Sequence, residues 1–270
     1  MIEPSQTISA GAWDAASRPM RRMGHVIEAH GSITSTNDRA RVLLALPDGD
    51  GRVVVADEQT EGRGRRGREW LSPPGLNLLV SVAIRPRLAA QDAWQLGLAV
   101  ALAVADACAE VAPVALKWPN DLVSAADGKK AGGLLIETMA EGDRLSGAVV
   151  GIGVNLNWRL DAMPEELRGT ATSLADLAGA PVDRVALLGR LLAALEEELD
   201  AIEAGRSPLE RYRARCSTLG QTVSVATADG SVTGRAVDLD PGGGLVVEAA
   251  DGRHVISSGE VVRVVPGSVA

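Results

Sequence analysis

The spacing of apolar and polar positions changes once along this 270-residue chain. Up to about residue 217, apolar runs of strand length are mixed with longer stretches that show helical spacing. From residue 218 only short apolar runs occur, and Gly-containing turns separate them at hairpin spacing. The pattern predicts an α+β fold, a mixed β-sheet flanked by helices, followed by a small all-β barrel.

The apolar runs of the first part predict strands at residues 52–56, 77–84, 115–118, 122–123, 133–138 and 148–154. Helical spacing predicts helices at residues 39–44, 91–111, 182–204 and 209–216. Two stretches without an apolar period, 57–74 and 155–174, are expected to be loops. Loops of this length inside a compact domain are usually functional or disordered.

Three regions follow from this pattern. Residues 1–24 show no periodicity and are expected to form a loose leader, too short for a helix-turn-helix module ahead of the core. Residues 25–217 are expected to form the main domain, and residues 218–270 the barrel. The barrel strands are expected at residues 222–226, 232–237, 245–248 and 254–256.

Composition narrows the class of protein. Hydrophobic residues make up 46% and charged residues 23%, which is typical of a chain that buries a core. The formal net charge of -8 argues against nucleic acid as the main partner. Cys108 and Cys216 lack CxxC spacing, and no apolar run reaches the roughly 20 residues of a membrane span. We therefore expect a cytoplasmic protein without a membrane partner.

The loop Glu61–Trp70 is rich in residues suited to binding an anionic ligand. It contains three glycines and four arginines: Gly62, Gly64, Gly67, Arg63, Arg65, Arg66 and Arg68. Glycines allow close approach to a ligand, and guanidinium groups suit phosphate and carboxylate. Trp70 offers a flat face to an aromatic ring in a chain with few aromatics. Taken alone, the string also fits a solvated basic loop, and less well an RGG-like nucleic-acid tract.

Three further motifs follow along the chain. Lys117–Asp121 (KWPND) ends a strand in a turn that projects an amide and a carboxylate, able to hold Mg²⁺ or simply to form an Asx turn. Gly128–Gly133 (GKKAGG) offers a lysine to an anion, or an exposed turn lysine. Gly151–Asn155 (GIGVN) allows close ligand approach but is weak by itself. No metal-ligand spacing involves the three histidines, and no Gly-x-Ser-x-Gly elbow, Walker loop or dinucleotide fingerprint occurs.

In order and spacing, the residues Ser35-Thr36-Asn37, Gln59, GRGRRGR-x-W, KWPND, KKAGG and GxGxN resemble the biotin protein ligase family over residues 30–265. The resemblance implies a catalytic domain like that of class II aminoacyl-tRNA synthetases and biotin ligases, followed by an SH3-like barrel. It is closest to the monofunctional type, without an N-terminal DNA-binding domain. Two departures are the doubled lysine at Lys129 and Ala131-Gly132-Gly133 in place of Leu-Ala-Gly.

The resemblance also implies the site. Biotin would be bound by Ser35, Thr36, Asn37, Gln59, Arg63, Gly64, Arg65 and Lys130. ATP and the adenylate would be bound by Arg65, Arg66, Trp70, Asn120, Asp121, Lys130 and Asn155. Lys130 and Arg65 would be catalytic, and Asp121 would hold Mg²⁺. Trp158 is a candidate lid residue in a loop that closes over the adenylate.

The implied activity is ATP-dependent activation of biotin as biotinyl-5′-AMP and transfer to a lysine of a biotin carboxyl carrier domain. Biotin and ATP would be substrates, Mg²⁺ a cofactor, and the enzyme a monomer or weak homodimer. Loops 58–74 and 157–174 are expected to be partly disordered until ligand binds. Lipoate or octanoate attachment is the rival enzyme class, and a non-catalytic biotin-binding module is the rival from another class.

Overall fold

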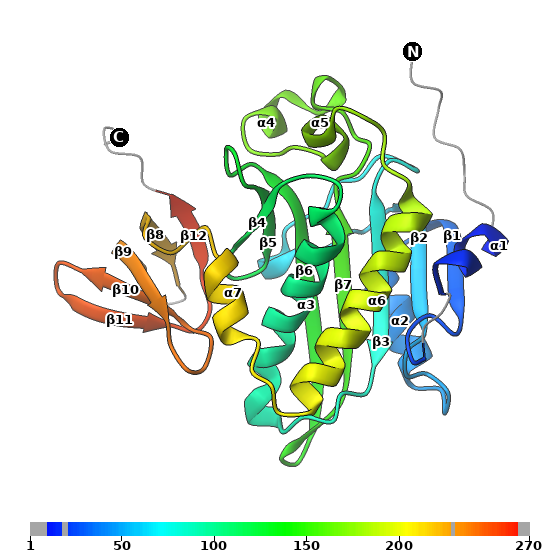
Figure 1. The fold of residues 1–270 in the computed structure, drawn as a ribbon, viewed down its shortest axis with the longest axis horizontal. Helices are drawn as coiled ribbons and strands as arrows, with labels where there is room; N and C mark the ends of the chain where they lie inside the picture. Colours follow the sequence, from blue (N-terminus) through cyan, green and yellow to red (C-terminus); the bar gives the residue numbers. More distant parts are fainter. Residues whose placement is uncertain (1–9, 18–20, 228–229, 264–270) are drawn as a thin grey trace.

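The computed structural model describes residues 10–17, 21–227 and 230–263. In this part of the chain a seven-stranded mixed sheet carries helices on both faces, and a five-stranded antiparallel sheet lies beside it (Figure 1). The strand orders are β1-β2-β3-β7-β6-β5-β4 in the large sheet and β11-β10-β9-β8-β12 in the small one. Strands β1 and β2 pair in parallel, and all other pairings are antiparallel.

The elements have the following bounds. The strands of the large sheet are β1 (Ile27–Ile33), β2 (Val53–Gln59), β3 (Leu78–Ile84), β4 (Val114–Lys117), β5 (Asp121–Ser124), β6 (Lys130–Glu141) and β7 (Arg144–Val154). Those of the small sheet are β8 (Thr222–Ala226), β9 (Ser231–Leu239), β10 (Leu245–Ala249), β11 (Gly252–Ile256) and β12 (Glu260–Arg263). The α-helices are α1 (Ala10–Trp13), α2 (Thr36–Leu44), α3 (Ala93–Ala109), α4 (Glu165–Arg168), α5 (Leu174–Ala178), α6 (Arg184–Glu203) and α7 (Leu209–Arg215). Short 3₁₀ turns are η1 (Asp14–Ser17), η2 (Arg65–Gly67), η3 (Ala90–Asp92) and η4 (Leu160–Ala162).

Alternation along the strands sorts side chains onto two faces of the large sheet. Val53 and Val55 belong to the main core, where α3 and α6 cover the sheet. Val54 belongs to a smaller cluster under α2, on the opposite face. Figure 1 shows α3 and α6 side by side in front of the sheet and α2 behind it. The α2 face is the less covered one, and the functional site lies there.

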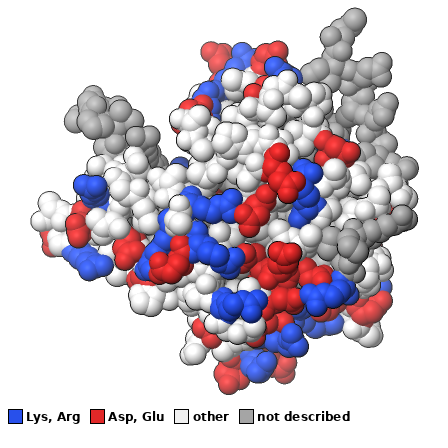
Figure 2. All heavy atoms as spheres, in the orientation of Figure 1, with Lys and Arg blue, Asp and Glu red and all other residues white. Residues whose placement is uncertain are grey.

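Residues Ala90–Ala109 are long and apolar enough to cross a membrane by length and composition alone. In the structure, 61% of this window is buried, because α3 packs against α6 and the sheet. Such a helix is typical of the core of a globular domain. On the molecular face in Figure 2, basic and acidic side chains are interspersed rather than gathered by sign.

The predicted mixed sheet with flanking helices is confirmed, and so is the separate antiparallel C-terminal unit. Strands β1 and β12 were not predicted. Residues 10–17, placed in a loose leader, instead form α1 and η1, with Trp13 and Ala16 only 2% exposed. Eight residues are too few to show a period, and tertiary packing decides their conformation. Residues 1–9 and 18–20 of the predicted leader lie outside the described part of the chain.

Candidate active site

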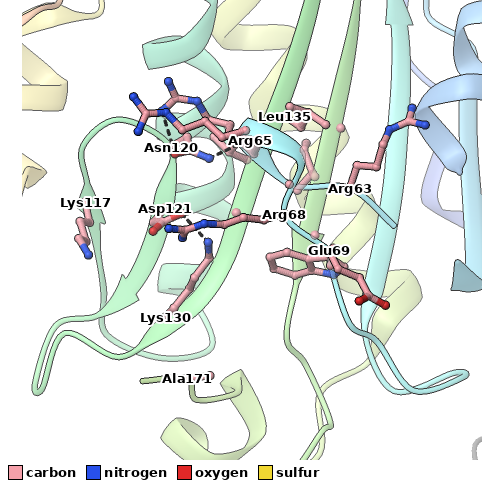
Figure 3. A pocket seen from close by; sticks show the side chains of 18 of the residues that line it. Arg63, Arg65, Arg68, Glu69, Lys117, Asn120, Asp121, Lys130, Leu135 and Ala171 are labelled. Atoms are coloured by element: carbon pink, nitrogen blue, oxygen red, sulfur yellow. Dashed lines mark hydrogen bonds and ion pairs between the residues drawn. The ribbon is translucent and has the colours of Figure 1, made fainter. Parts of the chain in front are cut away.

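One cavity of about 550 Å³ lies on the α2 face of the large sheet. Its walls come from the start of α2, strands β5 to β7, the loop after β2 and residues 259–262. Figure 3 shows the labelled side chains of the loop after β2 and of β5 and β6 around it. Every residue assigned to the site from the sequence lines this cavity: Ser35, Thr36, Asn37, Gln59, Arg63, Gly64, Arg65, Arg66, Trp70, Asn120, Asp121, Lys130 and Asn155. Trp158 lines it as well. Segments more than 100 residues apart in the chain therefore build a single site.

The polar end of the cavity is organised around the N-terminus of α2. The Thr36 backbone N–H and hydroxyl both donate to Gln59 Oε1, at 2.8 and 3.0 Å. Asn37 Nδ2 donates to Glu137 Oε2 at 2.8 Å, and its Oδ1 lies 2.6 Å from the Ser81 hydroxyl. These groups hold one another in fixed orientations, as recognition of a polar ligand head requires.

Glycines of β7 make room for two of these side chains. A Cβ on Gly151 would lie 2.2 Å from Asn37 Oδ1. One on Gly153 would lie 2.7 Å from two ring atoms of Trp70. Gly153 pairs with Gly133 of β6, whose Cβ would also approach Trp70, at 3.2 Å. The glycines of the GxGxN and KKAGG motifs thus form a floor on which the indole rests.

Trp70 and Lys130 face each other above this floor. Lys130 Nζ lies 5.6 Å from the centroid of the Trp70 ring, within cation–π range. The indole Nε1 is buried and has no hydrogen-bond partner among the described residues. A buried donor without a partner is costly, so a ligand acceptor at this point would be favoured.

The lysine of the KKAGG motif that reaches the site is Lys130. Its Nζ lies 2.7 Å from Asp121 Oδ1, on the neighbouring strand. Lys129 instead pairs with Asp127, at 3.9 Å, and does not line the cavity. Of the two adjacent lysines, Lys130 is therefore the one that lies in the cavity.

The arginines of the loop after β2 separate into different roles. Arg63 donates two hydrogen bonds to Asp38, at 2.9 and 2.5 Å, and points away from the other basic residues in Figure 3. Hydrogen bonds from Arg63 lower the pKa of the Asp38 carboxyl. Arg65 Nη1 contacts Asn120 Oδ1 at 3.3 Å, and Nη2 donates to the Ser258 hydroxyl at 2.9 Å. The cationic centre of the cavity is therefore Arg65 and Lys130 rather than Arg63.

Arg65 sits in a partly desolvated position. Burial, reinforced by the positive charge of Arg66, lowers the pKa of the Arg65 guanidinium, and Asp121 opposes this effect. Arg66 itself has a left-handed backbone with φ of 58°, so the loop turns sharply at this point. Arg68 forms an ion pair with Glu260 of β12, which ties the same loop to the small sheet.

Asn155 and Asn157 anchor the second loop. Asn155 Nδ2 donates to the Thr172 carbonyl at 3.0 Å, so Asn155 holds the end of this loop beside the cavity. Asn157 makes reciprocal bonds with the backbone of Val182, at 2.8 and 3.0 Å. Between these anchors Trp158 packs with Met163 and Ala171 in a small apolar cluster. The segment predicted to be irregular thus contains η4 and α4 and is held at both ends.

The carboxylate set suits Mg²⁺ only together with a ligand. The part of the chain that the structure describes contains no group of three or more His, Cys, Asp or Glu side chains that could hold a metal ion. Asp121 supplies one carboxylate in the cavity, beside Lys130. Mg²⁺ is usually held by one or two carboxylates plus substrate phosphates, so Asp121 fits a metal that arrives with a nucleotide.

Sequence reasoning missed several contributors. Ser81, fully buried in β3, orients Asn37, and its polar side chain within an apolar strand was a usable signal. Glu137 also orients Asn37. Ser258 and Glu260 approach from the small sheet, and no local pattern identifies a contact with residues about 190 positions earlier.

Comparisons with known proteins agree with this geometry. Residues 30–155 match the Biotin/lipoate A/B protein ligase family, and residues 218–264 match the Biotin protein ligase C terminal domain. The Bifunctional ligase/repressor BirA of Bacillus subtilis is 34% identical, over 88% of this chain and 74% of its own length. The Biotin--[acetyl-CoA-carboxylase] ligase of Paracoccus denitrificans is 36% identical, over 84% of this chain and 96% of its own length.

Solved structures show the same likeness. The biotin protein ligase from Aquifex aeolicus, in complex with biotin and ATP, is 32% identical and superposes with a TM-score of 0.74. The match covers 88% of this chain and 98% of the Aquifex chain. The identities, the coverage and the two matched domains show that this chain belongs to the biotin protein ligase family.

Proposed function

We propose that this protein is an ATP-dependent ligase that activates biotin as biotinyl-5′-AMP and transfers the biotinyl group to a lysine of a biotin carboxyl carrier domain. AMP and pyrophosphate are the other products. One observation carries the proposal: a single cavity joins the polar Thr36–Asn37–Gln59 end to the cationic Arg65–Lys130 centre and the Trp70 face. Two substrates of matching chemistry can therefore meet in it. Family membership supports the same reaction.

Biotin binds at the polar end. Its ureido group offers N–H donors and a carbonyl acceptor, which match the amide and hydroxyl groups of Ser35, Thr36, Asn37 and Gln59. The valeryl chain then runs along the sheet face toward Arg65 and Lys130, which attract the carboxylate. Because Asp38 already binds Arg63, a role of Arg63 and Gly64 at this carboxylate requires that the loop change conformation.

ATP binds at the other end. Trp70 packs beside the adenine, while Arg66, Asn120 and Asn155 line the nucleotide side. Asp121 would hold Mg²⁺ against the phosphates, where the metal would offset their negative charge.

In the first step a biotin carboxylate oxygen forms a bond to the α-phosphorus, and the bond from that phosphorus to the pyrophosphate oxygen breaks. Two anions must approach each other for this attack. Arg65 and Lys130 lower the repulsion and stabilise the charge that develops on the α-phosphate oxygens. Their positive charges are already in place, within a partly buried cavity, before the reaction begins.

In the second step the neutral amine of the acceptor lysine attacks the acyl carbon, and AMP leaves with the bonding electron pair. The acyl phosphate is reactive enough that no nucleophilic side chain of the enzyme is needed, which fits a site without a Ser/His/Asp arrangement. Trp158 and the segment up to residue 174 exclude water from the intermediate.

The remaining assignments complete the proposal. The catalytic domain spans residues 25–217 and the SH3-like domain residues 218–270. The protein acts in the cytoplasm, as a monomer or weak homodimer, on a biotin-dependent carboxylase. Its specificity follows from recognition of the carrier domain rather than of nucleic acid.

Exchange of labelled pyrophosphate into ATP tests the proposal, with biotin, octanoate, lipoate and no acid compared. Exchange that requires biotin is the expected result. Exchange driven by octanoate or lipoate would replace the proposal with the rival acyl substrates. A protein that binds biotin but catalyses no exchange would be a binding module, and the proposed reaction would be wrong.

A further inference from the structure

A buried ion pair lies outside the cavity and has no role in the chemistry above. Arg184, the first residue of α6, and Asp57 of β2 are 5% and 6% exposed, and Arg184 Nη1 lies 2.7 Å from Asp57 Oδ1. Burial of charge is unfavourable, and a cation at a helix N-terminus opposes the helix dipole. Neither helix formation nor stability therefore accounts well for an arginine at this position.

The pair sits where both ends of the arginine loop meet. We call residues 58–74, which are the end of β2 and the loop after it, the arginine loop; Asp57 precedes it and Gly75 follows it. The Gly75 N–H donates to the Asp57 carbonyl at 2.9 Å, and Arg184 Nη1 donates to the Gly75 carbonyl at 3.1 Å. One guanidinium group thus contacts the residue before the loop and the residue after it. We call this arrangement of Asp57, Gly75 and Arg184 the neck clamp.

The clamped loop carries the ligand-binding groups. Gln59 lies two residues beyond Asp57 and holds Thr36. Arg65 and Trp70 lie further along the same loop, and Ser72 is held by Asn77 just beyond the neck. A change at the neck therefore shifts the start and the end of this loop together.

The N-terminal segment closes over the clamp. The Trp13 ring lies 5.2 Å from the Arg184 guanidinium carbon and is 2% exposed. The segment is held against α6, where a Cβ on Gly189 would lie only 3.4 Å from the Ala16 carbonyl. Arg184 Nε and Nη2 have no hydrogen-bond partner in the described residues, so the Trp13 ring adds a cation–π contact to the ion pair with Asp57.

We propose that Arg184 is a positioning residue that clamps the neck of the arginine loop, and that residues 10–17 seal this clamp through Trp13. The inference rests on the proposed function and extends it. Affinity for biotin and retention of biotinyl-AMP depend on a residue that touches neither. The segment before the catalytic domain then tunes the site instead of serving as an inert leader.

The test compares Arg184→Lys, Trp13→Leu and a control, Glu203→Gln. Arg184 Nη1 alone contacts both Asp57 and the Gly75 carbonyl, and a lysine keeps the positive charge but lacks the rigid planar group that holds this nitrogen between them and beneath the Trp13 ring. The Glu203 side chain, at the other end of α6, is 2% exposed and pairs with Arg22 at 2.9 Å and with Arg87 at 2.8 Å, so Glu203→Gln controls for the loss of an α6 ion pair away from the neck. The full-length protein is used for the Kd of biotin, the release rate of biotinyl-AMP, cleavage by trypsin at Arg63 to Arg68, and Tm.

Arg184→Lys is expected to raise the Kd of biotin about five- to tenfold and to accelerate trypsin cleavage of the ligand-free loop. Trp13→Leu is expected to raise the Kd of biotin and the trypsin cleavage rate by a smaller factor. Glu203→Gln is expected to lower Tm but to leave the Kd of biotin and the cleavage rate at wild-type values. Trp13→Leu also tests the proposal if Arg184→Lys does not fold.

Equal cleavage rates and biotin affinities in the folded Arg184→Lys or Trp13→Leu variant and in Glu203→Gln would overturn the inference. Trypsin cleavage is measured without ligand, so it reports whether the clamp holds the loop even if the protein does not activate biotin. Absence of biotin-dependent exchange in the wild-type protein would instead refute the proposed function.

Discussion

Gly153 shows how a single missing side chain shapes the site. Trp70 lies on the Gly153 backbone so closely that a Cβ would meet the ring at 2.7 Å. The sequence motif GxGxN suggested close approach of a ligand to the backbone. In the structure the group that approaches is a side chain of the protein, the Trp70 indole.

Gly153→Ala is therefore expected to displace Trp70 and to raise KM for ATP by about tenfold, at an overpacking cost of about 1–3 kcal/mol. Gly147→Ala, on the same strand as Gly153, is the control, since its Cβ would meet the ends of two flexible side chains, Leu44 at 2.8 Å and Met139 at 3.5 Å. Initial rates of pyrophosphate exchange against ATP concentration measure both variants. An unchanged KM for ATP in Gly153→Ala would show that Trp70 does not contribute to ATP binding.

Lys130 and Lys129 provide a matched pair of adjacent lysines. Lys130→Ala is expected to reduce biotin-dependent exchange by at least about 100-fold, because the developing phosphate charge loses its partner. The Lys130 side chain is 38% exposed, so the fold tolerates its removal. Lys129→Ala should retain near wild-type exchange, and a larger loss in Lys129→Ala than in Lys130→Ala would reverse the assignment.

At the scale of elements, the predictable parts are those with strong local patterns. Helices α3 and α6 and strands β2, β3 and β7 carry long apolar periods and were predicted. Strand β1 was missed because Ala29 and Gly31 give its inward face little apolar character. The motifs identified the cavity residues, but contacts such as Arg65 with Ser258 depend on the packing of two sheets.

The two long loops carry a prediction at this scale. Arg63 to Arg68 and Arg159 offer trypsin sites in loops 58–74 and 157–174, respectively. Biotin with ATP is expected to slow cleavage in both loops, because residues of both loops line the cavity and an adenylate bound there would contact both. Digestion with and without ligands, followed by mass spectrometry, measures this. Equal cleavage rates would contradict closure of the loops over the intermediate.

Asn157 allows a sharper test of the second loop. Asn157→Ala removes both bonds to Val182, a loss of about 1–3 kcal/mol, and frees one end of the segment that contains Trp158. We expect faster AMP formation in the absence of acceptor, because water reaches the acyl phosphate more often. The measurement is AMP release from biotin and ATP alone. A wild-type rate would show that this anchor does not control water access.

At the scale of the whole molecule, the small sheet completes the cavity instead of standing apart. Trp118 of the KWPND motif donates from its backbone to the Thr218 hydroxyl at 3.0 Å and from its indole to the Gly243 carbonyl at 3.1 Å. These bonds fix the sheet beside β4. Residues 259–262 then line the cavity, and Glu260 pairs with Arg68 of the arginine loop.

Glu260→Gln tests this connection. The hydrogen bond from Arg68 lowers the pKa of the Glu260 carboxyl below its ordinary value of 4.5. A carboxyl with a lowered pKa keeps its contribution above that ordinary value and loses it only as pH falls through the lowered pKa. KM for ATP in the wild-type protein is thus expected to be insensitive to Glu260 between pH 5 and 8. Glu260→Gln should raise KM for ATP several-fold throughout this range, because the loop loses its charged partner. The contrary outcome is a wild-type KM for ATP that rises on acidification from pH 7 to 5.5, with no such rise in Glu260→Gln. Glu260 would then take up its proton far above the expected range. In that case the ion pair with Arg68 would not hold the loop.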